Sequence, residues 1–259
     1  MTKPSTEHSE RPQPAPSAQT CCSIVELRQY TLYPGTRDVL IDLFDREFVE
    51  SQEALGMKVI GQFLDLDDPN RFVWLRGFSD MPARAHALEA FYGGPVWKAH
   101  RDAANATMVD SDNVLLLRPA RQTSGFSLAS SQRPPLGANE VPKGLVVATI
   151  YYLNAPADAD FINFYERDLQ PVLTDAGASI LAYFVTETSV NNFPRLPVRE
   201  GETVFVWFSR FSDRVAYEHH VADVAQHCRG EISEELARWL KAPPEVRKLS
   251  PTARSQLPG

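Results

Sequence analysis

Hydrophobic positions along residues 24–117 switch between a period of two and a period near 3.6. Apolar residues at every second position are typical of strands, and a spacing of three to four is typical of helices. The predicted elements, in chain order, are a strand over Ile24–Leu32, a helix from the Thr36 N-cap through Phe48, a hairpin of Met57–Phe63 and Phe72–Phe78, a helix from Met81 to about Ala90 capped by Ser79 or Asp80, a helix from Pro95 through Met108 and a strand over Asn113–Leu117. This βαββαβ order is that of a ferredoxin-like unit.

The second half of the chain repeats this order. Residues Phe72–Asp80 (FVWLRGFSD) return as Phe205–Asp213 (FVWFSRFSD), 133 positions later and with six of nine residues identical. Upstream, Arg28 aligns with Ile150 at a spacing near 122, so one insertion over Thr188–Glu202 reconciles the two spacings. The predicted elements are a strand over Leu145–Leu153, a helix over Asp158–Thr174, a hairpin of Ser179–Thr186 and Thr203–Phe211, helices over 213–225 and 231–240 and a strand over Glu245–Leu249. We therefore expect a duplicated α+β unit of roughly 100 residues.

One polar segment precedes the first unit, and another separates the two units. Residues 1–22 are expected to be a disordered tail, because residues 1–20 are polar and rich in proline. The first domain is predicted over 23–120 and the second over 144–253. Residues 121–143 between them are rich in Ser, Gln, Pro and Gly, which is typical of a linker.

Composition excludes several classes of protein. The net charge of −7 and the pI near 5.4 argue against a nucleic-acid partner, which needs clustered Lys and Arg. No apolar run approaches the roughly 18 residues of a membrane span, and the amino-terminal residues lack the hydrophobic stretch of a secretory signal. Cys21, Cys22 and Cys228 are too few for a disulfide framework, so we expect free thiols and a cytoplasmic location.

Strand alternation gathers the charged and aromatic residues of the first unit on one sheet face. Glu26, Arg28 and Tyr30 share a face of the first strand, and Trp74 and Arg76 share a face of the third. We expect the predicted helices to cover the opposite face. An aromatic face left bare in this way is too apolar to stay in contact with water.

Trp207 occupies the corresponding face of the second unit. We therefore expect the two sheets to pack face to face, as tandem ferredoxin-like domains that form a closed or nearly closed α+β barrel with these faces inside. Charged groups in that interior must pair or bind a ligand. Two interpretations stay open: an ion pair of Glu26 with Arg28 or Arg76 that fixes the register, and a polar anchor for a ligand.

Residues 24–36 (IVELRQYTLYPGT) resemble the opening of NIPSNAP-family domains, in which a Glu-Leu-Arg-x-Tyr strand leads into a Pro-Gly-Thr turn and a helix. Residues 113–119 (NVLLLRP) are similar to the end of the same domain. The resemblance covers about 24–120 and is weaker over 144–252, where Ala-Thr-Ile replaces the Glu-Leu-Arg motif. It implies a dimeric α+β barrel, a superfamily that includes cofactor-free oxygenases, isomerases and haem proteins. Members of the NIPSNAP family mostly lack an assigned reaction.

One predicted helix carries the main candidate for proton transfer, His100. Its imidazole could act as a general base. The resemblance also implies a possible iron ligand, because haem-degrading oxygenases of the superfamily have a His on a helix at about this place. A structural His bonded to the backbone or to Asp102 is the alternative. Tyr92, Trp97 and Asn105 are candidates for the cavity mouth, with core packing as the other role of the two aromatic residues.

No metal site is predicted. His220 and His227 share a helix face, but the adjacent His219 points elsewhere, and zinc needs ligands that converge. The insertion over 188–202 carries two prolines with Arg195 and Arg199. A stiffened loop with arginines suits a lid or an anion clamp, and an arm that docks on the other half or on a second subunit is the alternative.

These observations favour a protein that binds a small apolar or aromatic ligand with an anionic or carbonyl group. Arg28 and Arg76 would anchor or polarise the ligand, and Tyr30, Trp74 and Trp207 would pack against it. The expected reaction is a cofactor-independent oxygenation or isomerisation. A non-catalytic binding or scaffold protein and a haem-binding protein are the alternatives. We expect a homo-oligomer.

Overall fold

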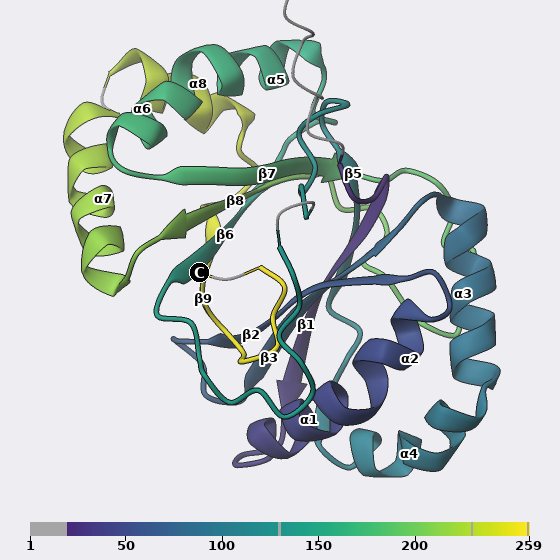
Figure 1. The fold of residues 1–259 in the computed structure, drawn as a ribbon. Coiled ribbons are helices and arrows are strands. Elements are labelled where there is room, and N and C mark those ends of the chain that lie inside the picture. Colours follow the sequence, from purple (N-terminus) through teal and green to yellow (C-terminus); the bar gives the residue numbers. More distant parts are fainter. Residues whose placement is uncertain (1–19, 129–130, 229, 258) are drawn as a thin grey trace, which may run out of the picture.

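The structure is a computed structural model that describes residues 20–128, 131–228, 230–257 and 259 (Figure 1). The first half contains β1 (Ile24–Leu32), α1 (Arg37–Leu43), the π-helical turn η1 (Phe44–Phe48), α2 (Val49–Glu53), β2 (Lys58–Asp65), β3 (Arg71–Phe78), α3 (Met81–Gly93), α4 (Pro95–Asn105), β4 (Met108–Asp110) and β5 (Val114–Pro119). The second half contains β6 (Leu145–Tyr152), α5 (Ala159–Phe164), η2 (Tyr165–Leu169), α6 (Gln170–Asp175), β7 (Ser179–Thr186), β8 (Val204–Phe211), α7 (Arg214–His227), α8 (Glu231–Trp239) and β9 (Glu245–Pro251). The predicted mixture of helices and strands is confirmed.

The helix that follows each hairpin begins in the same way in both halves. The Asp80 carboxylate accepts a hydrogen bond from the Ala83 amide at 2.7 Å, and the Asp213 carboxylate accepts one from the Ala216 amide at 2.8 Å. Each carboxylate satisfies an amide that lacks a partner inside the helix. The N-cap of α3 is therefore Asp80 rather than Ser79.

Two local predictions differ from the structure. The helix expected through Met108 ends at Asn105, and Met108 instead opens the short strand β4, opposite Leu32. Thr36 precedes α1, but its hydroxyl does not cap the helix; it donates to the backbone carbonyl of Tyr33.

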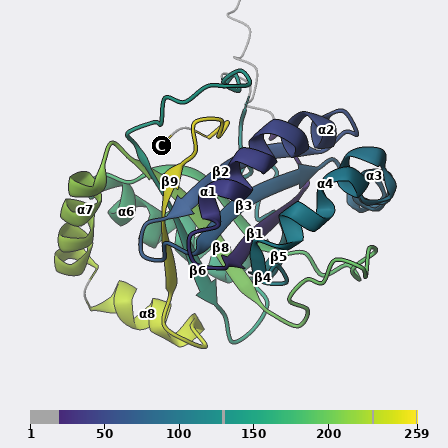
Figure 2. The same cartoon turned by 90° about the horizontal axis from the view of Figure 1, so that it is seen from below.

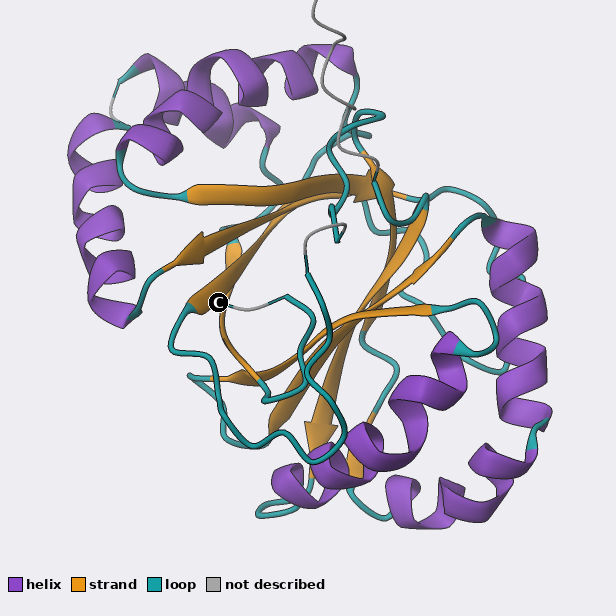
Figure 3. Ribbon diagram, in the orientation of Figure 1, coloured by secondary structure: helices purple, strands orange, loops and turns teal. Residues whose placement is uncertain are grey.

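Eight strands close into one barrel within the chain. The order around it is β1-β3-β2-β9-β6-β8-β7-β5, and β5 pairs again with β1. The two halves join along strand edges, through the pairs β2–β9 and β5–β7, which leave neither sheet with the free edges of an isolated unit. The helices lie outside the ring of strands, one group on each half (Figure 3).

Apolar side chains, most of them aliphatic, fill the barrel. Each of the eight strands contributes residues to one continuous buried cluster. Its members from the strands are Val25, Leu27, Ile60, Phe63, Val73, Leu75, Leu115, Leu117, Val146, Ala148, Ile150, Ala182, Phe184, Val204, Val206, Phe208 and Leu249. The barrel interior is therefore a packed core rather than a chamber for a ligand.

This packing overturns the expected direction of the aromatic faces. Tyr30 and Trp74 pack in a second cluster with residues of the first-half helices, and Trp207 packs in a third cluster with the second-half helices. Glu26, Arg28 and Arg76 share this helix-covered side with Trp74, since they alternate with the barrel residues. The residues predicted to share a face do share it, but the helices cover that face and the aliphatic face turns inward.

Strand pairing also corrects the alignment of the repeat by one position. Arg28 lies opposite Trp74 in the first half, and Thr149 lies opposite Trp207 in the second. The structural counterpart of Arg28 is therefore Thr149 rather than Ile150, at a spacing of 121.

The segment predicted as a linker is packed against the barrel where the structure describes it. Phe126 is 1% exposed, and its ring centroid lies 5.2 Å from that of Phe184 and 5.0 Å from that of Phe208. Leu257 joins the same cluster and donates its backbone amide to the Ile60 carbonyl. These residues cover one end of the barrel core.

Among the described residues, no helix has the length and apolarity that crossing a membrane requires.

Candidate functional site

Four charged side chains meet beneath the helices of the first half. Glu26 and Arg28 come from β1, Arg76 comes from β3 directly opposite Glu26, and Arg84 comes from α3. All four are at most 1% exposed. Arg84 reaches the sheet because it lies on the buried stripe of α3, together with Ala87, Leu88 and Phe91. We call Glu26, Arg28, Arg76 and Arg84 the charged cluster.

Glu26 is the common acceptor of the charged cluster. Its Oε2 accepts from Arg76 Nη2 at 2.6 Å and from Arg28 Nη1 at 2.8 Å. Its Oε1 accepts from Arg84 Nε at 2.7 Å. Both predicted pairs of Glu26, with Arg28 and with Arg76, are therefore present, and Arg84 adds a third partner. Hydrogen bonds of this length between charged groups are stronger than hydrogen bonds between neutral groups.

The charged cluster holds an excess of positive charge. Three guanidinium groups face one carboxylate, which leaves two positive charges uncompensated within the cluster. Burial alone would raise the pKa of Glu26, but attraction to the arginines outweighs burial and holds that pKa well below its usual value. Glu26 is thus ionised, and Arg84 Nη2 has no hydrogen-bond partner among the described residues.

A small cavity lies above the charged cluster, between the sheet and the helices. Its volume is about 30 Å³, room for one or two water molecules. Most of its lining side chains are aromatic or aliphatic, and the polar contributions come from Tyr30, Gln52 and Trp74. The residues around it are Tyr30, Leu40, Phe44, Phe48, Gln52, Trp74, Phe91, Tyr92, Trp97, Ala104 and Met108. We call this the aromatic pocket.

Two residues that line the aromatic pocket from its sheet side, Tyr30 and Trp74, carry hydrogen-bond donors. Trp74 is 2% exposed, and its indole Nε1 has no acceptor among the described residues. The Tyr30 oxygen accepts from Arg28 Nε at 3.0 Å, which leaves its own hydrogen free to donate. Burial raises the pKa of Tyr30, so the phenol keeps that hydrogen at neutral pH. Gln52, by contrast, is occupied on both sides, by Arg76 Nη1 and by the Phe48 carbonyl.

The insertion between β7 and β8 docks on the first half (Figure 2). The side-chain oxygens of Asn191 and Asn192 accept hydrogen bonds from Arg84 Nη1 at 3.0 and 2.9 Å. Phe193 is 5% exposed, and its ring lies 5.9 Å from that of Tyr92. We call residues 188–202 the strap. These contacts agree with one of the two alternatives for this loop, an arm that docks on the other half of the chain.

The two arginines predicted to act from the strap point away from the charged cluster. Arg195 pairs with Glu89 on the surface. Arg199 donates to the Tyr152 hydroxyl at 2.8 Å and to Glu202 at 2.5 Å. The groups that the strap brings to the cluster are the amides of Asn191 and Asn192.

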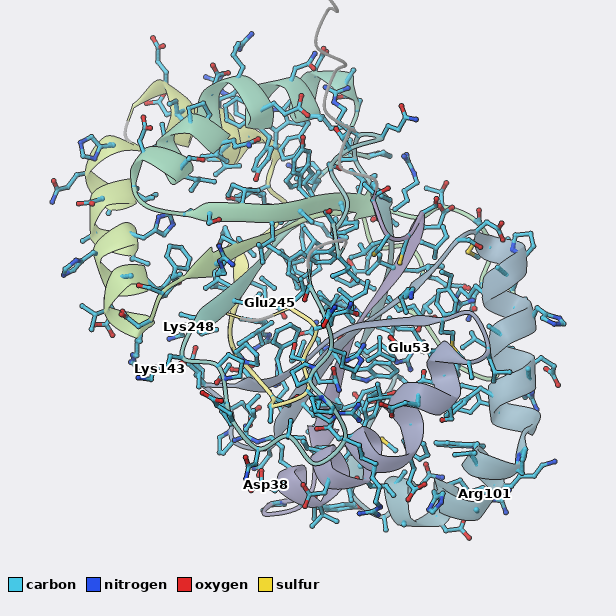
Figure 4. All side chains as sticks on the ribbon, viewed as in Figure 1. Asp38, Glu53, Arg101, Lys143, Glu245 and Lys248 are labelled. Atoms are coloured by element: carbon cyan, nitrogen blue, oxygen red, sulfur yellow. The ribbon has the colours of Figure 1, made fainter. Side chains whose placement is uncertain are left out.

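The predicted residues of α3 and α4 divide between the aromatic pocket and the surface. Tyr92 and Trp97 are half-buried and line the pocket. His100 does not line it; Nε2 lies 3.5 Å from Glu47 Oε2, and the ring packs on Phe48. Asn105 is exposed at the end of α4. Arg101 marks the solvent side of this helix in Figure 4, where it points out from the molecule.

The second half has no counterpart of the charged cluster. A residue of β1 has its counterpart 121 positions later, and a residue of β3 or α3 has its counterpart 133 positions later. Each of the four counterparts is uncharged. The counterparts of Glu26, Arg28, Arg76 and Arg84 are Val147, Thr149, Ser209 and Tyr217. This half folds into the same arrangement of strands and helices, so the charges are not required by the fold.

A larger hollow of about 420 Å³ lies along the strap, between β5 and β7. Of the two arginines that line it, Arg199 is already paired with Glu202 and Arg118 is exposed. Much of its wall is exposed strap, including Val190 at 84% exposure. It lies apart from the charged cluster. We regard the aromatic pocket as the candidate site.

Within the described residues, no group of three or more His, Cys, Asp or Glu side chains is placed to hold a metal ion. His220 instead contacts the Ala176 carbonyl, and His227 contacts the Asp223 carbonyl.

Three residues of the site, Arg84, Gln52 and Asn191, were not predicted from the sequence. Arg84 could have been found, because it lies at helical spacing with Ala87 and Phe91 after the Asp80 cap. Asn191 is 107 residues from Arg84, and no local pattern links two such positions.

Comparison with known proteins agrees with this geometry. Residues 25–122 match the sequence model of the NIPSNAP family. No curated protein matches the chain. Among solved structures, an anthrone oxidase-like protein shares 13% identity over 90% of this chain and 94% of its own, with a TM-score of 0.54. A protein of Fusobacterium nucleatum that is provisionally named a monooxygenase shares 9% identity over 88% and 92%, with a TM-score of 0.53. A protein of Lactobacillus acidophilus with the same provisional name shares 13% over 88% and 93%, with a TM-score of 0.51. The likenesses to these three structures show a shared α+β barrel fold, and the match to the NIPSNAP model lies in the first half of the barrel.

Proposed function

We propose that this protein binds a small aromatic molecule in the aromatic pocket of its first half. The observation that carries the proposal is the contrast between the halves. Trp74 and the matching Trp207 both have an indole Nε1 without a described partner. In the first half this donor and the Tyr30 hydroxyl lie beside buried charges, and the second half has uncharged residues at the positions of those charges. Buried polar groups without partners are costly, so they are retained where they contact something else.

The pocket must widen when such a ligand enters. Its volume of about 30 Å³ is far below that of a drug-sized site. Tyr92 and Trp97 form the half-buried outer wall, on either side of the Gly93–Gly94 junction between α3 and α4. Movement of α4 at that junction would open the pocket without disturbing the strands.

Cofactor-independent oxygenation of the bound ligand is a second candidate. The anthrone oxidase-like neighbour and the two neighbours provisionally named monooxygenases favour it through the shared fold. In this chemistry the ligand itself reduces oxygen: an acidic CH2 group and O2 give a carbonyl and water. The positive charge behind Tyr30 would stabilise the ligand's enolate. No His, Asp or Glu is among the described lining residues, so this reaction and an isomerisation both need a ligand acidic enough to lose its proton to water.

The experiment compares two tryptophan variants with anthrone as the probe. Trp74→Phe removes the free indole donor of the pocket, and Trp207→Phe makes the same change at the matching position of the second half. We expect anthrone to quench tryptophan fluorescence in the natural protein and in Trp207→Phe, and to bind at least about fivefold more weakly to Trp74→Phe. Equal binding by both variants would refute the proposed site. Oxygen uptake in the same samples distinguishes turnover from binding alone.

The repeated segment supports a duplication, in which both halves descend from one NIPSNAP-like, ferredoxin-like unit. The matching caps Asp80 and Asp213 and the matching π-helical turns η1 and η2 also support it. Since one chain closes the barrel by itself, the expected homo-oligomer stays a prediction for light scattering to test.

A further inference from the structure

We infer that the ligand of the aromatic pocket is an anion, of the class of aromatic carboxylates. This inference rests on the proposed function and adds the charge of the ligand to it. Three features support it: the free hydrogen-bonding groups of the pocket, the net charge behind them and the uncharged residues that the second half has in place of that charge, where Trp207 Nε1 also has no described partner.

The free polar groups of the pocket are donors. Trp74 Nε1–H has no acceptor among the described residues, and the Tyr30 hydroxyl accepts from Arg28 but donates to no described residue. The acceptor that could compete, Gln52 Oε1, is already taken by Arg76. A ligand that places acceptor oxygens against Tyr30 and Trp74 therefore satisfies both free hydrogens, and a carboxylate offers two such oxygens.

The charge behind these donors has the sign that a carboxylate needs. The Arg28 guanidinium lies 5.4 Å from the Tyr30 ring centroid and 5.5 Å from that of Trp74, and the Arg76 guanidinium lies 5.0 Å from that of Trp74. The donors thus form a thin layer between the pocket and two of the three arginines. Glu26 compensates one charge of three, so an anion in the pocket is attracted by the remainder in a poorly screened interior.

Arg84 supplies the third positive charge of the charged cluster. It is fully buried, Nη2 has no described partner, and the strap offers it only neutral amide oxygens, from Asn191 and Asn192. A second carboxylate at the strap would have cancelled one positive charge. Neutral acceptors instead satisfy hydrogen bonds and keep the charge available.

The test is isothermal titration of the full chain with benzoate and with benzamide, which have nearly the same shape and differ in charge. We expect benzoate to bind at least about tenfold more tightly than benzamide. Equal affinities would overturn the inference and leave the proposed function standing. Binding of neither probe would count against both.

Two variants isolate the role of charge. Arg84→Gln removes one positive charge and keeps a neutral donor; it should weaken benzoate several-fold and leave benzamide unchanged. The fourfold variant Glu26→Val, Arg28→Thr, Arg76→Ser and Arg84→Tyr installs the residues of the second half and should abolish the preference. A preference that survives in folded samples of both variants would overturn the inference. Thermal melts identify the folded samples, and Arg84→Gln decides the outcome if the fourfold variant does not fold.

Discussion

Glu26 of β1 accepts a hydrogen bond from Arg84 of α3, 58 positions later in the chain, with 2.7 Å between Oε1 and Nε. This contact ties the helix to the sheet through a charge pair that neither element could bury alone. It also explains why Glu26 stays ionised although it has no contact with solvent, since Arg76 and Arg28 hold its other oxygen.

The first prediction concerns Glu26→Gln. This change leaves three buried guanidinium groups without their counterion, and breaking a buried charge network from one side costs roughly 3–5 kcal/mol. We expect a large fall in the midpoint of urea unfolding. The control is Glu89→Gln, which removes the partner of Arg195 in a pair whose side chains are 61% and 68% exposed. That change should cost less than about 1 kcal/mol. Similar losses in the two variants would show that burial of the charged cluster matters little.

The second prediction concerns Phe193→Ala. This side chain is 5% exposed and packs with Tyr92, so its truncation should cost about 3–5 kcal/mol. Hydrogen exchange should speed up in α3, where the strap is held by Asn192 and the Met81 carbonyl. Val190→Ala, at an 84% exposed position of the same strap, should stay within about 0.5 kcal/mol of the natural protein. Unchanged exchange in α3 would mean that the strap rests on the helix without supporting it.

The third prediction is a pH dependence that originates at Asp45. Burial raises the pKa of this carboxyl to about 6, against the opposing hydrogen bond from Gln62. The folded state therefore holds the proton more tightly than the unfolded state, and stability falls as pH rises from about 4 to about 6. Asp45→Asn removes that loss and keeps an acceptor for Gln62. Its gain over the natural protein should grow across this range to on the order of 2 kcal/mol.

Urea unfolding at a series of pH values measures this effect. Asp38→Asn is the control, because Asp38 is exposed at the start of α1 and points away from the molecule in Figure 4. The loss of stability between about pH 4 and pH 6 should shrink more in Asp45→Asn than in Asp38→Asn. An equal change in the two variants would place the titrating group elsewhere.

The fourth prediction addresses haem. His100 lies behind Phe48 with respect to the aromatic pocket and faces Glu47. We therefore expect haem titration to give no Soret band that depends on His100. The measurement is the absorption spectrum of the natural protein and of His100→Ala with equal haem. A band present only in the natural protein would contradict this expectation. It would mean that α4 rearranges and that the protein binds haem through His100.

Alternation along β1 and β3 was enough to predict which residues share a face, because successive side chains of a strand point to opposite sides. It could not decide which side the helices cover, since Val25 and Leu27 are apolar like Tyr30 and Trp74. On these two strands the aromatic residues lie under the helices, and the aliphatic residues point into the barrel. The NIPSNAP resemblance and the barrel were accessible from short motifs. The contact of Asn191 with Arg84 was not, because it depends on how two halves of the chain dock.

The closure of the barrel within one chain has an evolutionary consequence. In a symmetric dimer of identical subunits, every substitution appears twice, and a new charge must be tolerated at both symmetry-related positions. Covalent linkage of the halves removes that constraint, so position 26 can hold Glu while its counterpart at position 147 holds Val. The second half can therefore hold uncharged residues such as Val147, Thr149 and Ser209 at positions where the first half holds buried charge.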